Sequence, residues 1–308
     1  MTVRILQVDC RDGLKTLPDE SVHCVVTSPP YWLMRDYGCI GQLGLESTPS
    51  AFVDALVGVF SEARRVLRGD GTLWLNLGDS YAQSEVRHRN GSTGTMNGPE
   101  TGWNAGTYQV GRKLAHGLEP KNLIGIPWRV AFALQADGWY LRQDIIWSKP
   151  NPMPESVRDR CTKAHEYIFL LSKSERYYFD ADAIAEPAAI GARRFNGAHT
   201  GNIDRQDNGR QDTEAATERN KRSVWTVTTK PFSEAHFATF PTDLIEPCIL
   251  AGCPVGGTVL DPFGGAGTTG LVADRLGRNA ILIELNPEYA EMARKRIYND
   301  APLFAEVR

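Results

Sequence analysis

The 308-residue sequence predicts an α/β fold with a mostly parallel β-sheet and helices on both of its faces. Short apolar runs rich in valine, isoleucine and leucine alternate along the chain with segments that repeat apolar residues at helical spacing. Such runs are typical of strands that are buried on both faces of a sheet. Several runs end in glycine, proline or polar residues, as expected where strands open into binding loops.

Composition excludes several classes of protein. Hydrophobic residues make up 42% of the chain and charged residues 23%, which is ordinary for a soluble globular protein. No apolar run has the length of a membrane span or of a signal peptide core, so we expect a cytoplasmic protein with no membrane partner. The six cysteines are scattered, so we expect reduced thiols and no metal site. The net charge of −3 still allows local nucleic-acid binding.

Most of the chain can be assigned to elements from its pattern alone. Thr48 and Pro49 mark a helix start, because a hydroxyl caps free backbone N–H groups and proline suits the first helical position. We expect Gly69-Asp70-Gly71 to end that helix. The expected strands lie at 3–8, 22–26, 72–77, 140–147, 166–171, 258–261 and 279–284, and the expected helices at 11–17, 48–67, 127–136, 242–250, 267–276 and from Asn286 onward.

Two polar segments interrupt this pattern. Residues 82–119 are rich in glycine, asparagine, serine and threonine, and a loop of this length in a compact domain is usually functional or disordered. Residues 183–230 are similar, with eight basic and six acidic residues from position 186 onward. On charge alone, the second segment is interpreted as a solvated surface excursion.

Residues 27–32, Thr-Ser-Pro-Pro-Tyr-Trp, follow the buried strand at 22–26. Two prolines fix φ twice and remove two backbone donors, which leaves a rigid group at the end of the strand. That group offers the Ser28 hydroxyl, the Pro29 carbonyl and the Tyr31 ring. Because ligands in open α/β sheets bind beyond the carboxyl ends of strands, these residues predict a ligand site. The alternative is a Pro-Pro turn with aromatic residues in the core.

A second loop, residues 261–270, has the sequence Asp-Pro-Phe-Gly-Gly-Ala-Gly-Thr-Thr-Gly. Gly265 and Gly267 begin a G-x-G-x-x-G pattern, and Glu284 ends the next expected strand. The glycines allow close approach of a ligand to the backbone, and the acid can accept hydrogen bonds from a ribose, so an NAD-dependent oxidoreductase is one candidate. Asp261 ahead of the glycines suits a cationic ligand such as S-adenosylmethionine better than a pyrophosphate.

With both loops present, the sequence resembles the amino DNA methyltransferases, which methylate cytosine N4 or adenine N6. Members of that family combine an Asp/Ser/Asn-Pro-Pro-aromatic catalytic loop with an Asp-Pro-Phe-x-Gly-x-Gly-Thr-type cofactor loop. The catalytic loop comes first here, as in the circularly permuted β group. The resemblance covers most of residues 1–82, 120–182 and 231–308. It implies a Rossmann-like, S-adenosylmethionine-dependent methyltransferase fold that acts on double-stranded DNA.

The resemblance also implies a division of the chain. Residues 1–182 would form the catalytic half, in which the loop at 82–119 faces DNA. Residues 183–230 would form a target-recognition insertion, which changes their interpretation from a solvated excursion to a DNA reader. Residues 231–308 would form the cofactor-binding half. A homodimer and a cognate restriction endonuclease are compatible with this family, and the sequence itself indicates neither.

The family resemblance assigns the catalytic role to Ser28, Pro29, Pro30 and Tyr31. The target base must leave the duplex, because its amine is inaccessible there. The Ser28 Oγ and the Pro29 carbonyl would then accept the two amino hydrogens, and Tyr31 would stack on the base. Methyl transfer would depend chiefly on positioning.

The cofactor roles follow in the same way. Asp261 would bind the methionine amine, and Glu284 would bind the ribose. His236 to Pro241 corresponds to a segment that more often reads His-Pro-Thr-Gln-Lys-Pro in the family, from which this sequence departs at the second to fifth positions. The cofactor-binding residues that the resemblance implies are Asp261, Phe263, Gly265, Gly267, Thr268, Glu284, Pro241 and Thr242.

The predicted target base depends on Ser28. Serine at this position favours cytosine N4, whereas aspartate would favour adenine N6, which is the alternative with the same mechanism. Asparagine would be more typical of enzymes that methylate RNA or protein amides. A non-catalytic scaffold that binds cofactor and nucleic acid is the alternative of another class, and the intact Ser28 to Tyr31 motif argues against it.

Overall fold

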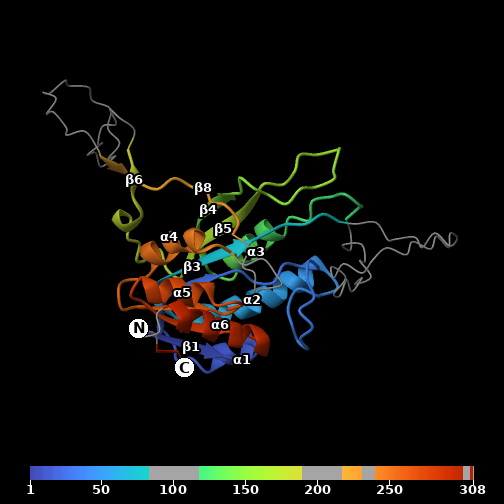
Figure 1. Cartoon of the computed structure of the whole chain (residues 1–308). Coiled ribbons are helices and arrows are strands. Elements are labelled where there is room, and N and C mark those ends of the chain that lie inside the picture. Colours follow the sequence, from blue (N-terminus) through green and yellow to red (C-terminus); the bar gives the residue numbers. More distant parts are fainter. Residues whose placement is uncertain (83–117, 189–216, 231–239, 301–305, 308) are drawn as a thin grey trace, which may run out of the picture.

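A nine-stranded sheet runs through the centre of the described part of the molecule (Figure 1). The structure is a computed structural model that describes residues 1–82, 118–188, 217–230, 240–300 and 306–307. In spatial order, the strands are β11 (Glu306–Val307), β1 (Thr2–Leu6), β10 (Asn279–Ile283), β9 (Thr258–Asp261), β2 (Val22–Thr27), β3 (Leu67–Leu77), β5 (His165–Ser172), β4 (Tyr140–Ser148) and β8 (Val224–Thr226). The short strands β6 (Glu186–Pro187) and β7 (Glu218–Arg219) form a separate pair.

Most neighbouring strands run parallel, which confirms the predicted sheet type. The exception is β5, because it runs antiparallel to both β3 and β4. Since β1, β10, β9, β2 and β3 are parallel, their carboxyl ends meet along one side of the sheet, here called the carboxyl edge. The loops that follow β2 and β9 are therefore neighbours, because these two strands pair directly.

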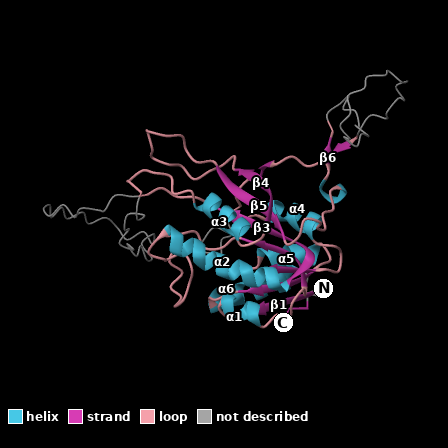
Figure 2. Ribbon diagram, turned by 180° about the vertical axis from the view of Figure 1, so that it is seen from behind, coloured by secondary structure: helices cyan, strands magenta, loops and turns pink. Residues whose placement is uncertain are grey.

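Helices cover both faces of the sheet (Figures 1 and 2). On one face lie α1 (Cys10–Lys15), α2 (Pro49–Val66) and α3 (Ile126–Ala136), with α2 and α3 in front in Figure 2. On the other face lie α4 (Thr242–Gly252), α5 (Thr268–Arg275) and α6 (Pro287–Asp300). Alternate residues of β3 point to the two layers, since Leu75 joins the core with α2 and Trp74 joins the core with α4. The sheet is therefore buried on both faces, as the apolar runs predict.

The structure confirms the predicted start of α2 and corrects its end. The Thr48 hydroxyl accepts a hydrogen bond from the Ala51 N–H at 3.1 Å, which caps the helix. The predicted end is wrong, because α2 stops at Val66 and Leu67 already pairs with Val22 in β3. The glycines expected to end the helix lie inside β3 instead. Leu67 is fully buried as the first residue of β3. Because it also falls at the spacing of the buried apolar residues of α2, the sequence pattern could not distinguish it from a helical residue.

The two polar segments lie mostly outside the described residues. For residues 82–119 and for residues 183–230, the structure describes only the ends. The C-terminal end of the second segment belongs to the main sheet, because β8 pairs with β4 and Trp225 packs in the core with α4. The division of the chain into a catalytic half, an insertion and a cofactor half stays a prediction.

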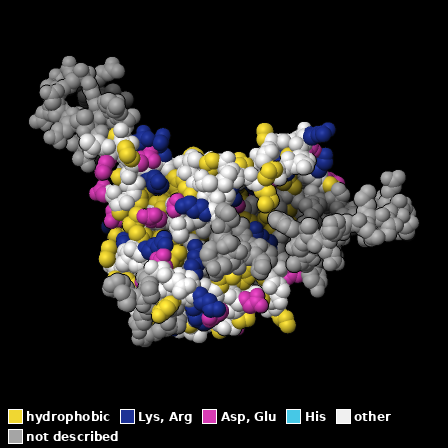
Figure 3. All heavy atoms as spheres, in the orientation of Figure 1, with side chains coloured by type: hydrophobic (Ala, Val, Ile, Leu, Met, Phe, Trp, Pro, Cys, Tyr) yellow, Lys and Arg dark blue, Asp and Glu magenta, His cyan; other side chains and the backbone are white. Residues whose placement is uncertain are grey.

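Figure 3 shows basic and acidic side chains mixed on the face that carries α4, α5 and α6. Two ion pairs involve these helices. Arg275 of α5 pairs with Asp300 of α6 at 2.5 Å, and Lys230, which precedes α4, pairs with Asp243 of α4 at 2.6 Å. Among the described residues, no helix is long and apolar enough to cross a membrane. The same residues contain no group of three or more His, Cys, Asp or Glu side chains that could hold a metal ion.

Candidate active site

The loop after β2 brings Ser28 and Tyr31 to the carboxyl edge of the sheet. Both side chains are half-buried, whereas Pro29 and Trp32 are buried. The Trp32 indole N–H donates to the Glu46 carbonyl at 2.9 Å, and its ring packs in the core with α2. Trp32 therefore anchors the loop and leaves Tyr31 as the aromatic residue of the motif that can face a base.

Side chains from two other strands hold the Tyr31 hydroxyl. It donates to Glu166 Oε2 at 2.6 Å and lies 3.1 Å from Asn76 Oδ1. The Asn76 Nδ2 donates to the same Glu166 oxygen at 3.3 Å and to the Tyr167 carbonyl at 3.1 Å. Burial and the neighbouring Glu166 raise the pKa of Tyr31 well above its ordinary value. The phenol is therefore neutral at physiological pH.

Two further contacts complete this arrangement. Lys149 forms an ion pair with Glu166 Oε1, and the two side chains are only 17% and 16% exposed. The Lys149 ammonium also lies over the Trp147 ring, 4.1 Å from its centroid. On the other side, the Tyr31 ring lies against Gly78, where an added Cβ would overlap Cε2 and come within 2.9 Å of Cδ2. The ring thus has a backbone wall beside it and a charged anchor at its hydroxyl.

A buried carboxylate joins the catalytic loop to the cofactor loop. The Thr27 hydroxyl donates to Asp261 Oδ1, and the Thr269 hydroxyl donates to Asp261 Oδ2, each at 2.6 Å. The Phe263 N–H also donates to Oδ1, at 3.0 Å. Burial raises the pKa of Asp261 to about 6, although the threonine hydroxyls and the Phe263 N–H act to lower it.

The carboxylate of Asp261 is enclosed by the protein. Its side chain is 1% exposed, and protein donors already occupy both of its oxygens. In this arrangement, Asp261 fixes Thr27, which directly precedes Ser28, against the start of α5. Asp261 thus supports the catalytic loop, and its predicted contact with the methionine amine stays a prediction.

The cofactor loop itself depends on glycine. Gly265 has a φ of +49° and donates its N–H to Glu284 Oε2 at 2.7 Å. Gly267 has a φ of +78°, and a Cβ there would lie 2.8 Å from the Ala293 Cβ on α6. Glu284 also accepts the Asn286 N–H at 2.7 Å, and burial raises the pKa of its carboxyl. The loop and the acid predicted to bind the ribose are thus in direct contact.

The remaining predicted cofactor residues lie in this loop or at the starts of α5 and α4. Phe263 is half-buried against the core, whereas Thr268 is 3% exposed and its hydroxyl accepts a hydrogen bond from Arg296 at 2.9 Å. Thr268 is therefore enclosed in the start of α5. Pro241 is buried and directly precedes α4, and the half-buried Thr242 begins it. The first residues of the segment that ends at Pro241 are not among those described.

A pocket of about 400 Å³ lies at the carboxyl edge, beyond the end of β3. Its lining includes Asp79, Tyr81, Arg160, Lys163, His165 and Tyr167. The Arg160 guanidinium lies 4.0 Å from the centroid of the Tyr81 ring. Aromatic rings beside cations are a common feature of surfaces that contact nucleic acids.

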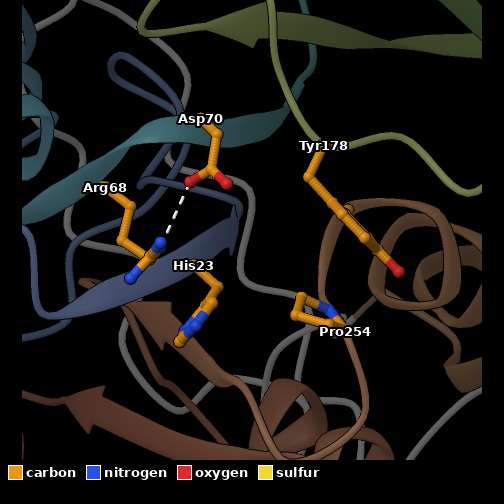
Figure 4. A pocket seen from close by; sticks show the side chains of 6 residues that line it. His23, Arg68, Asp70, Tyr178 and Pro254 are labelled. Atoms are coloured by element: carbon orange, nitrogen blue, oxygen red, sulfur yellow. Dashed lines mark hydrogen bonds and ion pairs between the residues drawn. The ribbon is translucent and has the colours of Figure 1, made fainter.

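A smaller pocket of about 190 Å³ lies at the opposite edge of the sheet (Figure 4). Figure 4 shows Arg68 paired with Asp70 on β3, with an Nε–Oδ1 distance of 3.2 Å, and His23 on β2 beside them. The His23 Nδ1 accepts the Thr258 N–H at 3.1 Å, which holds the imidazole at the start of β9. His23 and Arg68 lie at the amino ends of β2 and β3, so this pocket is remote from the two functional loops, which follow the carboxyl ends of their strands.

Sequence reasoning missed the residues that support the catalytic loop. Asn76, Glu166 and Lys149 come from β3, β5 and the end of β4, far from Tyr31 in the chain. One signal was available, because Asn76 is a polar residue within the otherwise apolar run 73–77. Nothing in the sequence, however, indicates which side chain such a residue faces.

The chain is similar to known proteins over most of its length. It matches the sequence profile of the N6/N4 family described as DNA methylase over residues 22–295. The Type II methyltransferase M.Cfr9I of Citrobacter freundii is 47% identical over 296 residues, which cover 96% of this chain and 88% of that relative. The chain belongs to the N6/N4 DNA methylase family. This confirms the family resemblance of the two loops.

Solved structures agree with this membership. A candidate DNA modification methylase from Thermus thermophilus, solved with S-adenosyl-L-methionine, superposes with a TM-score of 0.62 at 26% identity and covers 100% of both chains. The cytosine-N4-specific PvuII DNA methyltransferase gives a TM-score of 0.65 at 19% identity, over 100% of this chain and 95% of its own, which shows the shared fold. The N6/N4 methylase described here is therefore an S-adenosylmethionine-dependent DNA methyltransferase.

Proposed function

We propose that this enzyme methylates the N4 amine of a flipped cytosine in duplex DNA. The observation that carries the proposal is the Ser28 hydroxyl, a neutral group at the position where a carboxylate would favour adenine N6. Ser28 is half-buried at the carboxyl edge, and Thr27 before it is fixed to Asp261 at 2.6 Å. The alternative is adenine N6, reached by the same mechanism.

The chemistry asked of the catalytic loop is positioning. An exocyclic amine is a poor nucleophile because its lone pair is delocalised into the ring, and the base must first leave the duplex at a cost of a few kcal/mol. The Tyr31 ring stacks on the extruded base. The Ser28 Oγ and the Pro29 carbonyl accept its two amino hydrogens, which directs the nitrogen lone pair toward the methyl donor. No strong base is needed, because the methylated amine is acidic and loses its proton readily.

The residues around the glycine loop fit S-adenosylmethionine. Gly265 has a positive φ and only the Phe263 carbonyl within 4 Å of its absent Cβ, so the backbone there is open to close approach. Glu284 lies beside Gly265 as an acceptor for ribose hydroxyls, and Gly267 shapes the loop by packing on Ala293 of α6. Phe263 and Thr242 are half-buried nearby and would contact the rest of the cofactor. The bound cofactor supplies the methyl group as an electrophilic sulfonium methyl.

The partners are proposed from the site and from the relatives. The Tyr81–Arg160 pair at the carboxyl edge suits a contact with duplex DNA. Residues 82–119, which follow Tyr81 in the sequence, and residues 183–230 are candidate recognition segments. M.Cfr9I is named a Type II methyltransferase, which supports a place for this enzyme in a restriction–modification system with a cognate endonuclease. A homodimer stays a further proposal.

The test of the proposed base is direct. Duplex DNA methylated by the purified enzyme is digested to nucleosides, and the nucleosides are identified by mass spectrometry. We expect N4-methylcytosine. N6-methyladenine without N4-methylcytosine would contradict the proposal and support the alternative. Radiolabelled cofactor with plain duplex DNA also separates an enzyme from a binding scaffold, since a scaffold transfers no label.

Variants of the motif test the placement of the catalytic loop. Ser28→Ala and Tyr31→Ala should each remove methyl transfer while leaving cofactor affinity close to that of the wild type, because neither side chain contacts the glycine loop among the described contacts. Isothermal titration with S-adenosylmethionine measures that affinity. Loss of cofactor binding in both variants would show that the catalytic role has been assigned to the wrong loop.

A further inference from the structure

Glu166 is the point at which the contacts behind the catalytic loop converge. Its Oε1 pairs with Lys149, and its Oε2 accepts hydrogen bonds from Tyr31 at 2.6 Å and from Asn76 at 3.3 Å. These three partners come from three separate places in the chain. The carboxylate is 16% exposed, so little water competes for it.

Each hydrogen bond in this group has one direction. The Tyr167 carbonyl can only accept, so the Asn76 amide must turn its Nδ2 toward that carbonyl and its Oδ1 toward Tyr31. The phenol then has two acceptors for one proton. The proton lies toward Glu166, because the 2.6 Å distance is shorter than the 3.1 Å distance to Asn76 and because a charged acceptor forms the stronger bond.

The opposite side of the Tyr31 ring is equally constrained. Gly78 leaves no space for the ring to move toward β3, since even a Cβ at that position would overlap it. The ring is therefore fixed on two sides, by Gly78 along one edge and by the Glu166 carboxylate at its hydroxyl.

Stability alone is a weak reason for such an arrangement. Replacing an enclosed ion pair by uncharged residues is often neutral or stabilising, because both charges must be desolvated. Glu166 nevertheless combines an ion pair with a short hydrogen bond to the aromatic residue of the catalytic motif. The Glu166 carboxylate therefore serves to hold the Tyr31 phenol in one position and orientation.

We propose that Glu166 is a positioning residue for methyl transfer, and that its Lys149-paired carboxylate holds the Tyr31 ring where it must meet the extruded base. The proposal rests on the proposed function, because it requires a base stacked on Tyr31. It concerns the orientation of the ring and the reaction step. Cofactor binding, which uses the glycine loop, does not depend on it.

The first measurement is the single-turnover rate of methyl transfer to duplex DNA by Glu166→Gln. The glutamine retains an acceptor but loses the charge, so we expect the rate to fall roughly 10- to 100-fold, the range for loss of a hydrogen bond to a charged group. The KM for DNA should change much less, and cofactor affinity should stay within about twofold of the wild type. Asp300→Asn is the matched control, because it also removes the charge of a partly exposed, arginine-paired carboxylate, away from the carboxyl edge.

A double-mutant cycle separates positioning from a general structural role. Tyr31→Phe keeps the ring and removes the hydroxyl, so it should lower the rate by about as much as Glu166→Gln. Glu166→Gln added to Tyr31→Phe should then have no further effect on the rate. Additive losses would overturn the proposal, because they would mean that Glu166 acts through another group.

Three other outcomes are equally decisive. A Glu166→Gln enzyme with the wild-type rate overturns the proposal directly. Glu166→Gln could lower the melting temperature far more than Asp300→Asn does, and its rate would then also reflect a loss of stability. In that case the methyl-transfer rate of Tyr31→Phe tests the proposal, and a wild-type rate for Tyr31→Phe overturns it. A wild-type enzyme that transfers no methyl group to duplex DNA refutes the proposed function itself, which is a different failure from an active enzyme that is indifferent to Glu166.

Discussion

The catalytic loop after β2 and the cofactor loop after β9 lie at the same edge of the sheet, and they are held in place by different means. The cofactor loop is held through its backbone, by positive φ angles at Gly265 and Gly267 and by a hydrogen bond from the Gly265 N–H to Glu284, the residue after β10. The catalytic loop relies on side chains from elsewhere, since Glu166 and Asn76 reach the Tyr31 hydroxyl from β5 and β3.

The two means of support suit the two tasks. A loop that wraps a cofactor needs an open backbone, which glycine provides. A loop that must present one hydroxyl and one ring to a base needs those groups fixed within about an ångström, which requires contacts at the side chains themselves. Asp261 links the two loops through Thr27, so the donor site and the acceptor site keep a constant separation.

The strongest test of this contrast is Gly78→Ala. The added Cβ would overlap the Tyr31 ring, whose hydroxyl is anchored, so the ring must leave its position. We expect methyl transfer to fall by roughly 100- to 1000-fold, since misplacing a reacting group by about 1 Å costs on the order of 100-fold. Cofactor affinity, measured by calorimetry, should be unaffected because the glycine loop keeps its own support.

The control for Gly78→Ala is Gly58→Ala, which places the same methyl group in open space on the exposed side of α2. It should leave the transfer rate unchanged and stabilise the fold by about 0.5–1 kcal/mol, because alanine favours a helix. If Gly78→Ala were as active as Gly58→Ala, the ring of Tyr31 would not need its present place, and the distinction between the loops would fail.

Much of the fold follows from the sequence because it depends on local pattern. The buried strand at 22–26, the capped start of α2 at Thr48 and the strand–glycine–helix unit around Gly267 all carry their determinants within a few residues. The end of α2 could not be placed in this way. Leu67 is a buried residue of β3, and its position also fits the apolar spacing of α2. Only its pairing with Val22 shows that it belongs to the strand and not to the helix.

In the site too, the residues of local motifs could be predicted from the sequence, whereas contacts between distant parts of the chain could not. Ser28, Tyr31, Gly265 and Glu284 were accessible to sequence reasoning, because each belongs to a short motif with a chemical reason for its residue types. The partners of Tyr31 were not accessible, since Glu166 lies 135 positions away along the chain. Asp261 illustrates a third case, in which the motif was recognised but burial and two threonine donors give the carboxylate a different set of contacts.

The cofactor loop can be tested by comparing two glycines with almost equal φ angles. Gly267 has a φ of +78° with Ala293 close by, whereas Gly256 has a φ of +76° and nothing within 4 Å of its absent Cβ. Gly256→Ala should cost only the strain of a left-handed residue, about 1 kcal/mol of unfolding free energy. Gly267→Ala should cost about 3 kcal/mol, because overpacking against α6 is added to that strain, and it should also weaken cofactor binding.

Urea denaturation gives both free energies of unfolding, and calorimetry gives the cofactor affinity. Equal costs for the two variants would mean that only backbone conformation matters at Gly267. The close packing of the loop on α6 would then have no part in holding it, and the cofactor loop would be supported even more locally than the structure suggests.

The link between the loops should give the smallest effect, visible in the pH dependence of stability. Burial raises the pKa of Asp261 from 3.8 to about 6, so the folded state binds this proton more tightly than the unfolded state. The resulting stabilisation is complete below pH 3.8 and is lost as the pH rises through about 6. Between pH 4 and 7, we expect the wild type to lose about 2 kcal/mol of unfolding free energy relative to Asp261→Asn, which has no proton to release.

Asp300→Asn provides a control of opposite sign. The Arg275 side chain lowers the pKa of Asp300, so its contribution is present at neutral pH and is lost as the pH falls. Relative to Asp300→Asn, the wild type should therefore lose stability toward acid, whereas relative to Asp261→Asn it should gain. The same trend for both variants would mean that Asp261 is charged at little cost, in which case its carboxylate would be available to a cationic ligand after all.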